Sequence, residues 1–306
     1  MSKSKKYYHP DVLSKISSLQ LRARHVVEGF VSGMHKSPYK GFSVEFANHR
    51  AYVPGDDIRH IDWRVYAKAD RFFIKEYEEE TNMRVNLVVD GSGSMAYPAH
   101  PGTDRMTKWD YAATLATSLA HLLVLQQDAV GLTLFDQGIE VRTPVSSNRA
   151  ALHGLAATLE DHAPADRTDV KAVFEQLAAA VSQRGLVVIL SDLLAGTDDV
   201  VAGLERLRYT GQDVIVWHIM DHDELEFPFT DRTLFEGLEQ VDQEVLTDPQ
   251  ALRTSYLSNL RAFLDQIEGA CLNNRIDYML LDTAQPVDIA LATFLARRLH
   301  QQRARA

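Results

Sequence analysis

The chain has 306 residues, of which 45% are hydrophobic and 24% charged, a composition typical of a globular protein with one large domain or two modest ones. Its formal net charge of −10 argues against a general nucleic-acid binder, and no stretch approaches the roughly 18 apolar residues that a membrane helix needs. Cys271 is the only cysteine, and the basic N-terminal residues lack the apolar segment of a secretory signal. We therefore expect a cytoplasmic protein with no membrane span and no nucleic-acid partner.

The first 82 residues have a pattern of their own. Apolar residues recur at helical spacing from Val12 to Val26, which predicts an amphipathic helix. Alternating residues at Phe42–Phe46 and the run Phe72–Tyr77 are typical of strands. We predict that residues 1–82 form an N-terminal accessory region, a helix plus small β elements, that packs against the domain after it.

Strand and helix signals alternate from residue 83 onward. Strands are predicted at residues 85–89, 129–135, 139–143, 186–190, 214–220 and 278–281. Helices are predicted at residues 108–127, 148–159, 169–183, 198–209 and 287–300, with a further helix that begins at Pro249 after an Asp248 cap. Residues 222–247 fit no helix well and are expected to be an insertion with short extended pieces. The alternation predicts an α/β fold over residues 83–300, a mostly parallel sheet with helices on both faces.

Five oxygen-bearing side chains are expected at the carboxyl ends of central strands or in the loops beside them. They are Asp90, Ser92, Ser94, Thr168 and Asp192. Ligands of open α/β sheets bind at this end of the strands, and hard oxygen donors suit Mg²⁺ (or Mn²⁺/Ca²⁺). If strands 85–89 and 186–190 are neighbours, the five groups meet at one metal site. Taken singly, they also fit a plain turn at the serines and helix caps at Thr168 and Asp192.

Asp-x-Ser-x-Ser, followed by a later Thr and a later strand-end Asp, resembles the metal-ion-dependent adhesion site (MIDAS) of von Willebrand factor A domains. The resemblance implies a von Willebrand factor A-like (Rossmann-like) fold. It implies that Ser92, Ser94 and Thr168 are direct ligands, whereas Asp90 and Asp192 act mainly through bound water. It also implies an open coordination position that an acidic residue of a binding partner fills.

A second motif lies in the accessory region and reads Arg50-x-Tyr52-x-Pro54-Gly55-Asp56-Asp57-x-Arg59-x-Ile61-Asp62-Trp63. Glu45-Phe46 precedes it, and Lys75-x-Tyr77-x-x-Glu80 follows it. Together these residues resemble the bacterial domain-of-unknown-function family 58, which carries such a segment ahead of a von Willebrand-like domain. Proteins of that family often work beside AAA+ ATPases of the MoxR type. The resemblance therefore implies an adaptor for such an ATPase or its client.

The same motif contains a dense group of charged and aromatic side chains with two possible roles. The group consists of Asp56, Asp57, Arg59, Asp62 and Trp63. It can form an ion-pair and hydrogen-bond cluster that holds the accessory region to the sheet domain. Alternatively it can form a partner-binding surface, because Trp and Arg are frequent interface anchors.

Enzyme motifs are not found in the sequence. Gly91-Ser92-Gly93-Ser94 lacks the Gly-x-Ser-x-Gly pattern of a nucleophile elbow, and no phosphate-binding Gly-Lys-Ser/Thr is present. A metal-assisted, phosphatase-like hydrolase is the enzymatic alternative, with Arg105 or Arg167 as its phosphate-binding residue. A metal-free scaffold is a third reading. We predict a divalent-metal-dependent protein-binding adaptor and not an enzyme.

Overall fold

The computed structural model describes two parts of the chain. The described residues are 19, 23, 26, 27, 49–51, 66, 72–75, 83–98, 105–165, 167–181, 183–239 and 244–294. One compact unit comprises Met1–Gly33 and Met83–Ala306, and the other comprises Met34–Asn82. In the smaller unit, β1 (His49–Ala51) and β2 (Phe73–Lys75) form an antiparallel pair. The predicted strand at Phe42–Phe46 and the charged cluster from Asp56 to Trp63 lie outside the described residues.

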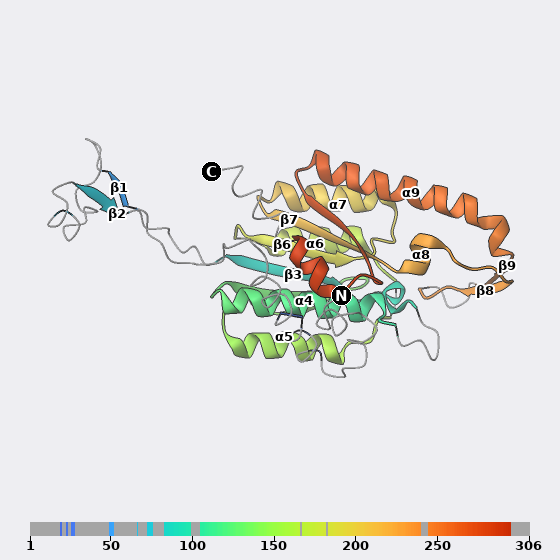
Figure 1. Ribbon diagram of the computed structural model, residues 1–306, viewed down its shortest axis with the longest axis horizontal. Coiled ribbons are helices and arrows are strands. Elements are labelled where there is room, and N and C mark those ends of the chain that lie inside the picture. The colour runs from blue at the N-terminus through green and yellow to red at the C-terminus, as the bar shows by residue number, and fades with distance from the viewer. Residues whose placement is uncertain are drawn as a thin grey trace, which may run out of the picture. The chain divides into compact units, whose positions relative to one another are not determined.

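A six-stranded sheet forms the centre of the larger unit (Figure 1). Its strands are β3 (Arg84–Asp90), β4 (Ala129–Phe135), β5 (Ile139–Arg142), β6 (Leu186–Ser191), β7 (Asp213–Met220) and β10 (Asp277–Asp282). The order is β10-β7-β6-β3-β4-β5, and every pairing is parallel except that of β4 with the edge strand β5. The order reverses between β3 and β6, so their carboxyl ends flank the point at which sheets of this kind bind ligands.

Helices cover both faces of the sheet, as Figure 1 shows. On one face lie α4 (Lys108–Leu125) and α5 (Arg149–Asp161), and on the other α6 (Val170–Ala180), α7 (Thr197–Tyr209) and α9 (Pro249–Asn273). Alternate residues of each buried strand point to opposite faces. In β6, Val188 and Leu190 join the core under α4, whereas Val187 and Ile189 join the core under α6 and α7. The predicted α/β class is confirmed.

The segment after β7 differs in part from the prediction. Residues 222–226 form a short helix, α8 (His222–Glu226), where no helix was expected. The reason is a capping box. The Asp221 side chain accepts a hydrogen bond from the backbone of Glu224, and the Glu224 side chain accepts one from the backbone N–H of Asp221. The expected extended pieces are β8 (Thr233–Glu236) and β9 (Glu244–Thr247), an antiparallel pair.

The described residues of the predicted N-terminal helix pack in the core of the sheet domain. Leu19, Val26 and Val27 are buried in the same core as α4 and α5, and the Leu19 N–H donates to the Glu160 carboxylate of α5. These contacts agree with the grouping of Met1–Gly33 with the sheet domain, and the accessory region over residues 1–82 stays a prediction. Within the described ranges, no helix is both long and apolar enough to cross a membrane.

Two glycines test the packing of the helices. A Cβ added to Gly203 of α7 would lie 2.5 Å from Cδ2 of Phe174 in α6, whereas one added to Gly154 of α5 meets nothing within 4 Å. Because overpacking strains a filled core, Gly203→Ala is expected to lower the free energy of unfolding by about 1–3 kcal/mol. Gly154→Ala is expected to raise it by about 0.5–1 kcal/mol, since alanine favours the helix. Urea unfolding checks both, and a Gly203→Ala protein as stable as the wild type would contradict the packing.

Candidate metal centre

The loop after β3 places the first predicted ligands at the carboxyl edge of the sheet. Asp90 is fully buried, and its Oδ1 and Oδ2 accept hydrogen bonds from the Ser92 N–H (3.0 Å) and the Ser191 hydroxyl (2.5 Å). The Oγ atoms of Ser92 and Ser94 lie 3.1 Å apart. Burial and the charge of Asp192 raise the pKa of Asp90 to about 7. Both oxygens of Asp90 are thus already hydrogen-bonded, whereas the two serine hydroxyls contact each other.

Gly91 lets a second loop lie directly against the backbone of the β3 loop. His162 Nε2 is 3.1 Å from the Gly91 carbonyl oxygen, which also accepts a hydrogen bond from the Ala165 N–H at 3.2 Å. A Cβ on residue 91 would lie 2.4 Å from His162 Nε2. Residue 91 must therefore be glycine, because His162 packs directly against its backbone. The loop that contains His162 continues to Thr168.

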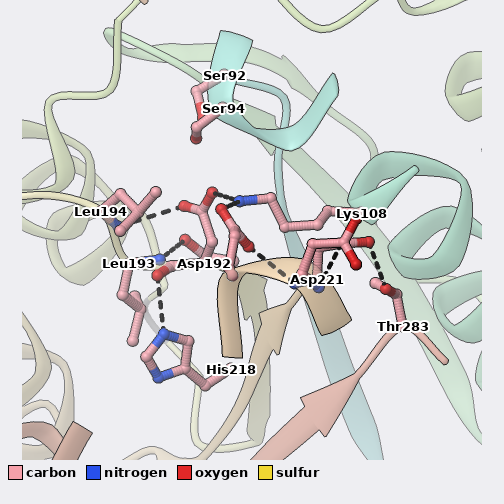
Figure 2. Close-up of polar contacts among 12 residues, drawn as sticks. Ser92, Ser94, Lys108, Asp192, Leu193, Leu194, His218, Asp221 and Thr283 are labelled. Carbon is pink, nitrogen blue, oxygen red and sulfur yellow. Dashed lines mark hydrogen bonds and ion pairs between the residues drawn. The ribbon is translucent and has the colours of Figure 1, made fainter. Parts of the chain in front are cut away.

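Asp192, directly after β6, is held by a buried lysine (Figure 2). Its Oδ2 accepts from Lys108 Nζ at 2.7 Å and its Oδ1 from the Leu194 N–H at 3.2 Å, and the Ser94 hydroxyl faces the same carboxylate. Lys108 is fully buried, and its Nζ also contacts Glu224 Oε1 at 2.8 Å. Burial acts to lower the pKa of Lys108 and to raise that of Asp192, but their mutual attraction outweighs it and reverses both shifts. The pair is therefore charged.

An ion-pair network connects this lysine to the insertion after β7. The second oxygen of Glu224 accepts from the Asp221 N–H at 2.8 Å within the α8 capping box. The Arg105 guanidinium contacts Asp221 at 2.5 Å and Asp223 at 2.9 Å, and the Thr283 hydroxyl donates to Asp221 at 2.7 Å. The network holds α8 beside the carboxyl ends of the strands.

His218 of β7 supports the backbone of Asp192 from below (Figure 2). Its Nε2 donates to the Asp192 carbonyl oxygen at 2.8 Å, and its Nδ1 accepts from the Tyr278 hydroxyl at 2.9 Å. Burial lowers the pKa of His218 to about 4, so the ring is neutral near pH 7.

Thr168 reaches the site through a residue that was not predicted, Glu239. The Ser94 hydroxyl and the N–H and hydroxyl of Thr168 face the Glu239 carboxylate and act to lower its pKa, but burial outweighs them and the pKa is raised. Glu239 Oε1 is buried and has no hydrogen-bond partner among the described residues. Arg167 Nε donates to the Glu239 carbonyl oxygen at 3.4 Å. One carboxylate therefore lies near both the serine loop and Thr168.

The helix-cap alternatives for Thr168 and Asp192 are not what the structure contains. The N-cap of α6 is Asp169, whose side chain accepts from the Ala172 N–H. The N-cap of α7 is Gly196. Neither predicted ligand is thus occupied in capping these helices.

The arrangement fits a divalent cation on two grounds. Adjacent ligands of an octahedral Mg²⁺ lie about 3.0 Å apart when its bonds are about 2.1 Å long, which matches the 3.1 Å between Ser92 Oγ and Ser94 Oγ. Neither Asp90 nor Glu239 has an ion-pair partner in the described part of the chain. No group of three or more His, Cys, Asp or Glu side chains among the described residues is placed to hold a metal. The oxygens at this site belong to hydroxyl and carboxylate groups, which are hard donors suited to such ions.

Comparison with known proteins assigns the family. The family described as "Protein of unknown function DUF58" matches residues 48–263, more than half of the chain. The chain belongs to the DUF58 family. Uncharacterized proteins of Mycobacterium tuberculosis (strain ATCC 25618 / H37Rv) and Mycobacterium bovis are each 26% identical to it over 253 residues, which cover 81% of this chain and 77% of theirs.

Solved structures similar to this DUF58 protein have low sequence identity. The conserved hypothetical protein BatB from Bacteroides thetaiotaomicron is 14% identical, covers 70% of this chain and 98% of its own, and has a TM-score of 0.43. The SpRpn10 VWA domain is 10% identical, covers 68% and 94%, and has a TM-score of 0.37. The strand order with its antiparallel edge β5 is that of a von Willebrand factor A-like fold, as the motifs predicted.

Sequence reasoning about the DUF58 chain missed three charged residues of the site. Lys108 stands four residues before Ala112 on the apolar stripe of α4, and a lysine in such a stripe indicates a buried anionic partner. Glu224 follows Asp221 by three residues, which is the spacing of a capping box. Glu239 gives no comparable signal, because nothing in the sequence of the insertion indicates that it approaches Ser94.

The buried ion pair of the DUF58 protein can be tested without metal, in EDTA. Lys108→Met is expected to lower the free energy of unfolding by about 3–5 kcal/mol, because Asp192 and Glu224 lose their buried counter-charge. The matched control is Lys171→Met, since Lys171 pairs with Asp199 at 3.3 Å and both side chains are more than half exposed. Its expected effect is below about 1 kcal/mol. Equal effects of the two substitutions in denaturant unfolding would contradict a charged buried pair.

Acid should weaken the fold through His218. Its pKa is about 4 in the folded protein, compared with 6.5 for an exposed histidine. Between these two pH values the unfolded chain binds more protons than the folded protein, so the free energy of unfolding falls as the pH falls. The loss is about 3 kcal/mol in total. The stability difference between the wild type and His218→Gln, measured in EDTA, is expected to shrink by this amount from about pH 7.5 to about pH 4. A difference independent of pH would show that His218 is not buried in neutral form.

Proposed function

We propose that this DUF58 protein is a divalent-metal-dependent protein-binding adaptor. The observation that carries the proposal is the convergence of hydroxyl and carboxylate oxygens beside the carboxyl ends of β3 and β6, where Ser94 faces both Asp192 and Glu239. Mg²⁺ is the expected ion, with Mn²⁺ or Ca²⁺ as substitutes, because every donor is a hard oxygen.

The five candidate ligands form two sets, which differ in whether their side-chain oxygens already accept hydrogen bonds from N–H or hydroxyl groups outside the set. Ser92, Ser94 and Thr168 would bind the ion directly. Asp90 and Asp192 would act through water, because each of their carboxylate oxygens already accepts a hydrogen bond. Neutral hydroxyl ligands leave most of the cation's charge uncompensated, so the bound ion would supply a strong electrostatic attraction for an Asp or Glu side chain of a partner.

The proposed partner is a MoxR-type AAA+ ATPase, or a client of one, that presents an acidic residue. This partner class is what the resemblance to the family implies. The charged cluster of Asp56, Asp57, Arg59, Asp62 and Trp63 stays a candidate second contact surface, and its structure lies outside the described residues.

We propose that the protein is not an enzyme. A metal-assisted hydrolase would need a cationic side chain free to bind phosphate. Of the two candidates, Arg105 is instead paired with Asp221 and Asp223, and Arg167 donates through Nε to the Glu239 carbonyl oxygen. Lys108 is fully buried between Asp192 and Glu224. Metal-dependent turnover of p-nitrophenyl phosphate that is lost in Asp90→Ala would favour the hydrolase.

Metal binding is the first test. Saturating Mg²⁺ or Mn²⁺, at about 100 times the dissociation constant, is expected to stabilise the wild type by about 3 kcal/mol. The double variant Ser92→Ala/Ser94→Ala should gain nothing, whereas Ser258→Ala, on the exposed side of α9, should behave like the wild type. Thermal unfolding and isothermal titration calorimetry measure both effects. A wild type that binds no divalent ion would support the metal-free scaffold.

Partner capture is the second test. The immobilised chain is expected to retain a MoxR-type ATPase encoded in the same genome when Mg²⁺ is present and to release it in EDTA. Asp90→Ala should abolish retention while leaving the circular dichroism spectrum unchanged, because Asp90 acts on the ion and not on a partner directly. Retention that survives both chelation and the substitution would contradict the proposed mechanism.

A further inference from the structure

Glu239 is the acidic side chain that the chain itself brings to the candidate metal centre. It lies three residues beyond β8, outside the Asp-x-Ser-x-Ser motif and the accessory-region motif. Its carboxylate lies near enough to the Ser94 hydroxyl and to the N–H and hydroxyl of Thr168 for these groups to act to lower its pKa. The Arg167 Nε–H donates a hydrogen bond to the Glu239 carbonyl oxygen at 3.4 Å. The position is thus bordered by two of the three hydroxyls assigned as direct ligands.

The Glu239 carboxylate is incompletely satisfied by its surroundings. Its Oε1 atom is buried and has no hydrogen-bond partner among the described residues, although the residue as a whole is only half-buried. Burying an unpaired carboxylate oxygen is costly. It also lies near Asp192, whose like charge repels it. A cation between the hydroxyls and the carboxylate would relieve both penalties.

We propose that Glu239 is an internal ligand of the ion, occupying the coordination position that a partner's carboxylate takes. The inference rests on the proposed function and adds regulation to it. A partner's acidic residue must then displace Glu239 before it can reach the metal. The protein alone would hold its ion in a self-occupied state.

The attachment of this segment supports displacement over permanent ligation. The beginning of the segment is anchored by ring contacts, with Phe227 and Phe235 stacked at 6.0 Å and Phe227 and Tyr256 at 4.6 Å between centroids. Beyond the anchor, the Glu239 carbonyl oxygen accepts an exposed and long hydrogen bond from Arg167 Nε at 3.4 Å. A tethered carboxylate has a high effective concentration at the site, so it fills the position without strong contacts of its own.

Mn²⁺ alone is the probe that tests the inference. Glu239→Gln keeps the size of the side chain but removes its charge, so it is expected to weaken Mn²⁺ binding at least about tenfold. Water-proton relaxation of bound Mn²⁺ is expected to show one additional exchangeable water in the variant, because water replaces the lost ligand. Glu239→Ala should give the same result. Glu236→Gln, an exposed carboxylate of β8, is the matched control and should leave affinity and hydration unchanged.

Partner capture separates this inference from the proposed function. At saturating Mn²⁺, Glu239→Gln should retain more MoxR-type ATPase than the wild type, since the internal competitor is gone. If the wild type binds Mn²⁺ but the Glu239 variants match it in affinity and hydration, the internal ligand is disproved and the proposed function stands. If the wild type binds no Mn²⁺, both are overturned.

Discussion

The buried ion pair between Lys108 and Asp192 is the interaction on which the site depends. It joins the start of α4 to the end of β6, next to the point where the strand order of the sheet reverses. Because neither group reaches water, each needs the other to stay charged. The pair also orients Asp192, directing one oxygen to the lysine and leaving the other toward Leu194 and the serine loop. The position of the aspartate is thus set by the protein before any ligand arrives.

This fixed framework leaves an excess of negative charge at the carboxyl edge. Lys108 balances part of Asp192 and Glu224, but neither Asp90 nor Glu239 has a cationic partner among the described residues. Burial and the neighbouring carboxylate accordingly raise the pKa of Asp90. Sites that break the rules of charge pairing in this way are characteristically functional. A proton on Asp90 relieves part of this excess, and the divalent cation proposed for the site would relieve more of it.

The sequence predicted the elements whose signals are local and missed the contacts that depend on tertiary structure. The strand at Leu186–Leu190 and the helix cap at Asp248 were predictable, because a continuous apolar run and an Asp-Pro pair can be recognised from neighbouring residues alone. The pairing of β3 with β6 was only a condition of the sequence argument, because alternating elements do not by themselves determine which parallel strands are neighbours. Glu239 was not predictable, since its approach to Ser94 depends on how an irregular insertion folds back over the sheet. Lys108 was predictable in principle, because its place on the apolar stripe of α4 indicates that it is buried.

An internal carboxylate would solve a problem that an exposed metal creates. A cation held mainly by neutral hydroxyls attracts any accessible Asp or Glu, and acidic side chains are common on protein surfaces. Affinity from the ion alone therefore gives little discrimination between partners. A tethered Glu239 sets a threshold, because a partner gains only the difference between its own contacts and those of the resident side chain. Partners with further complementary surface would exceed that threshold, whereas isolated carboxylates would not.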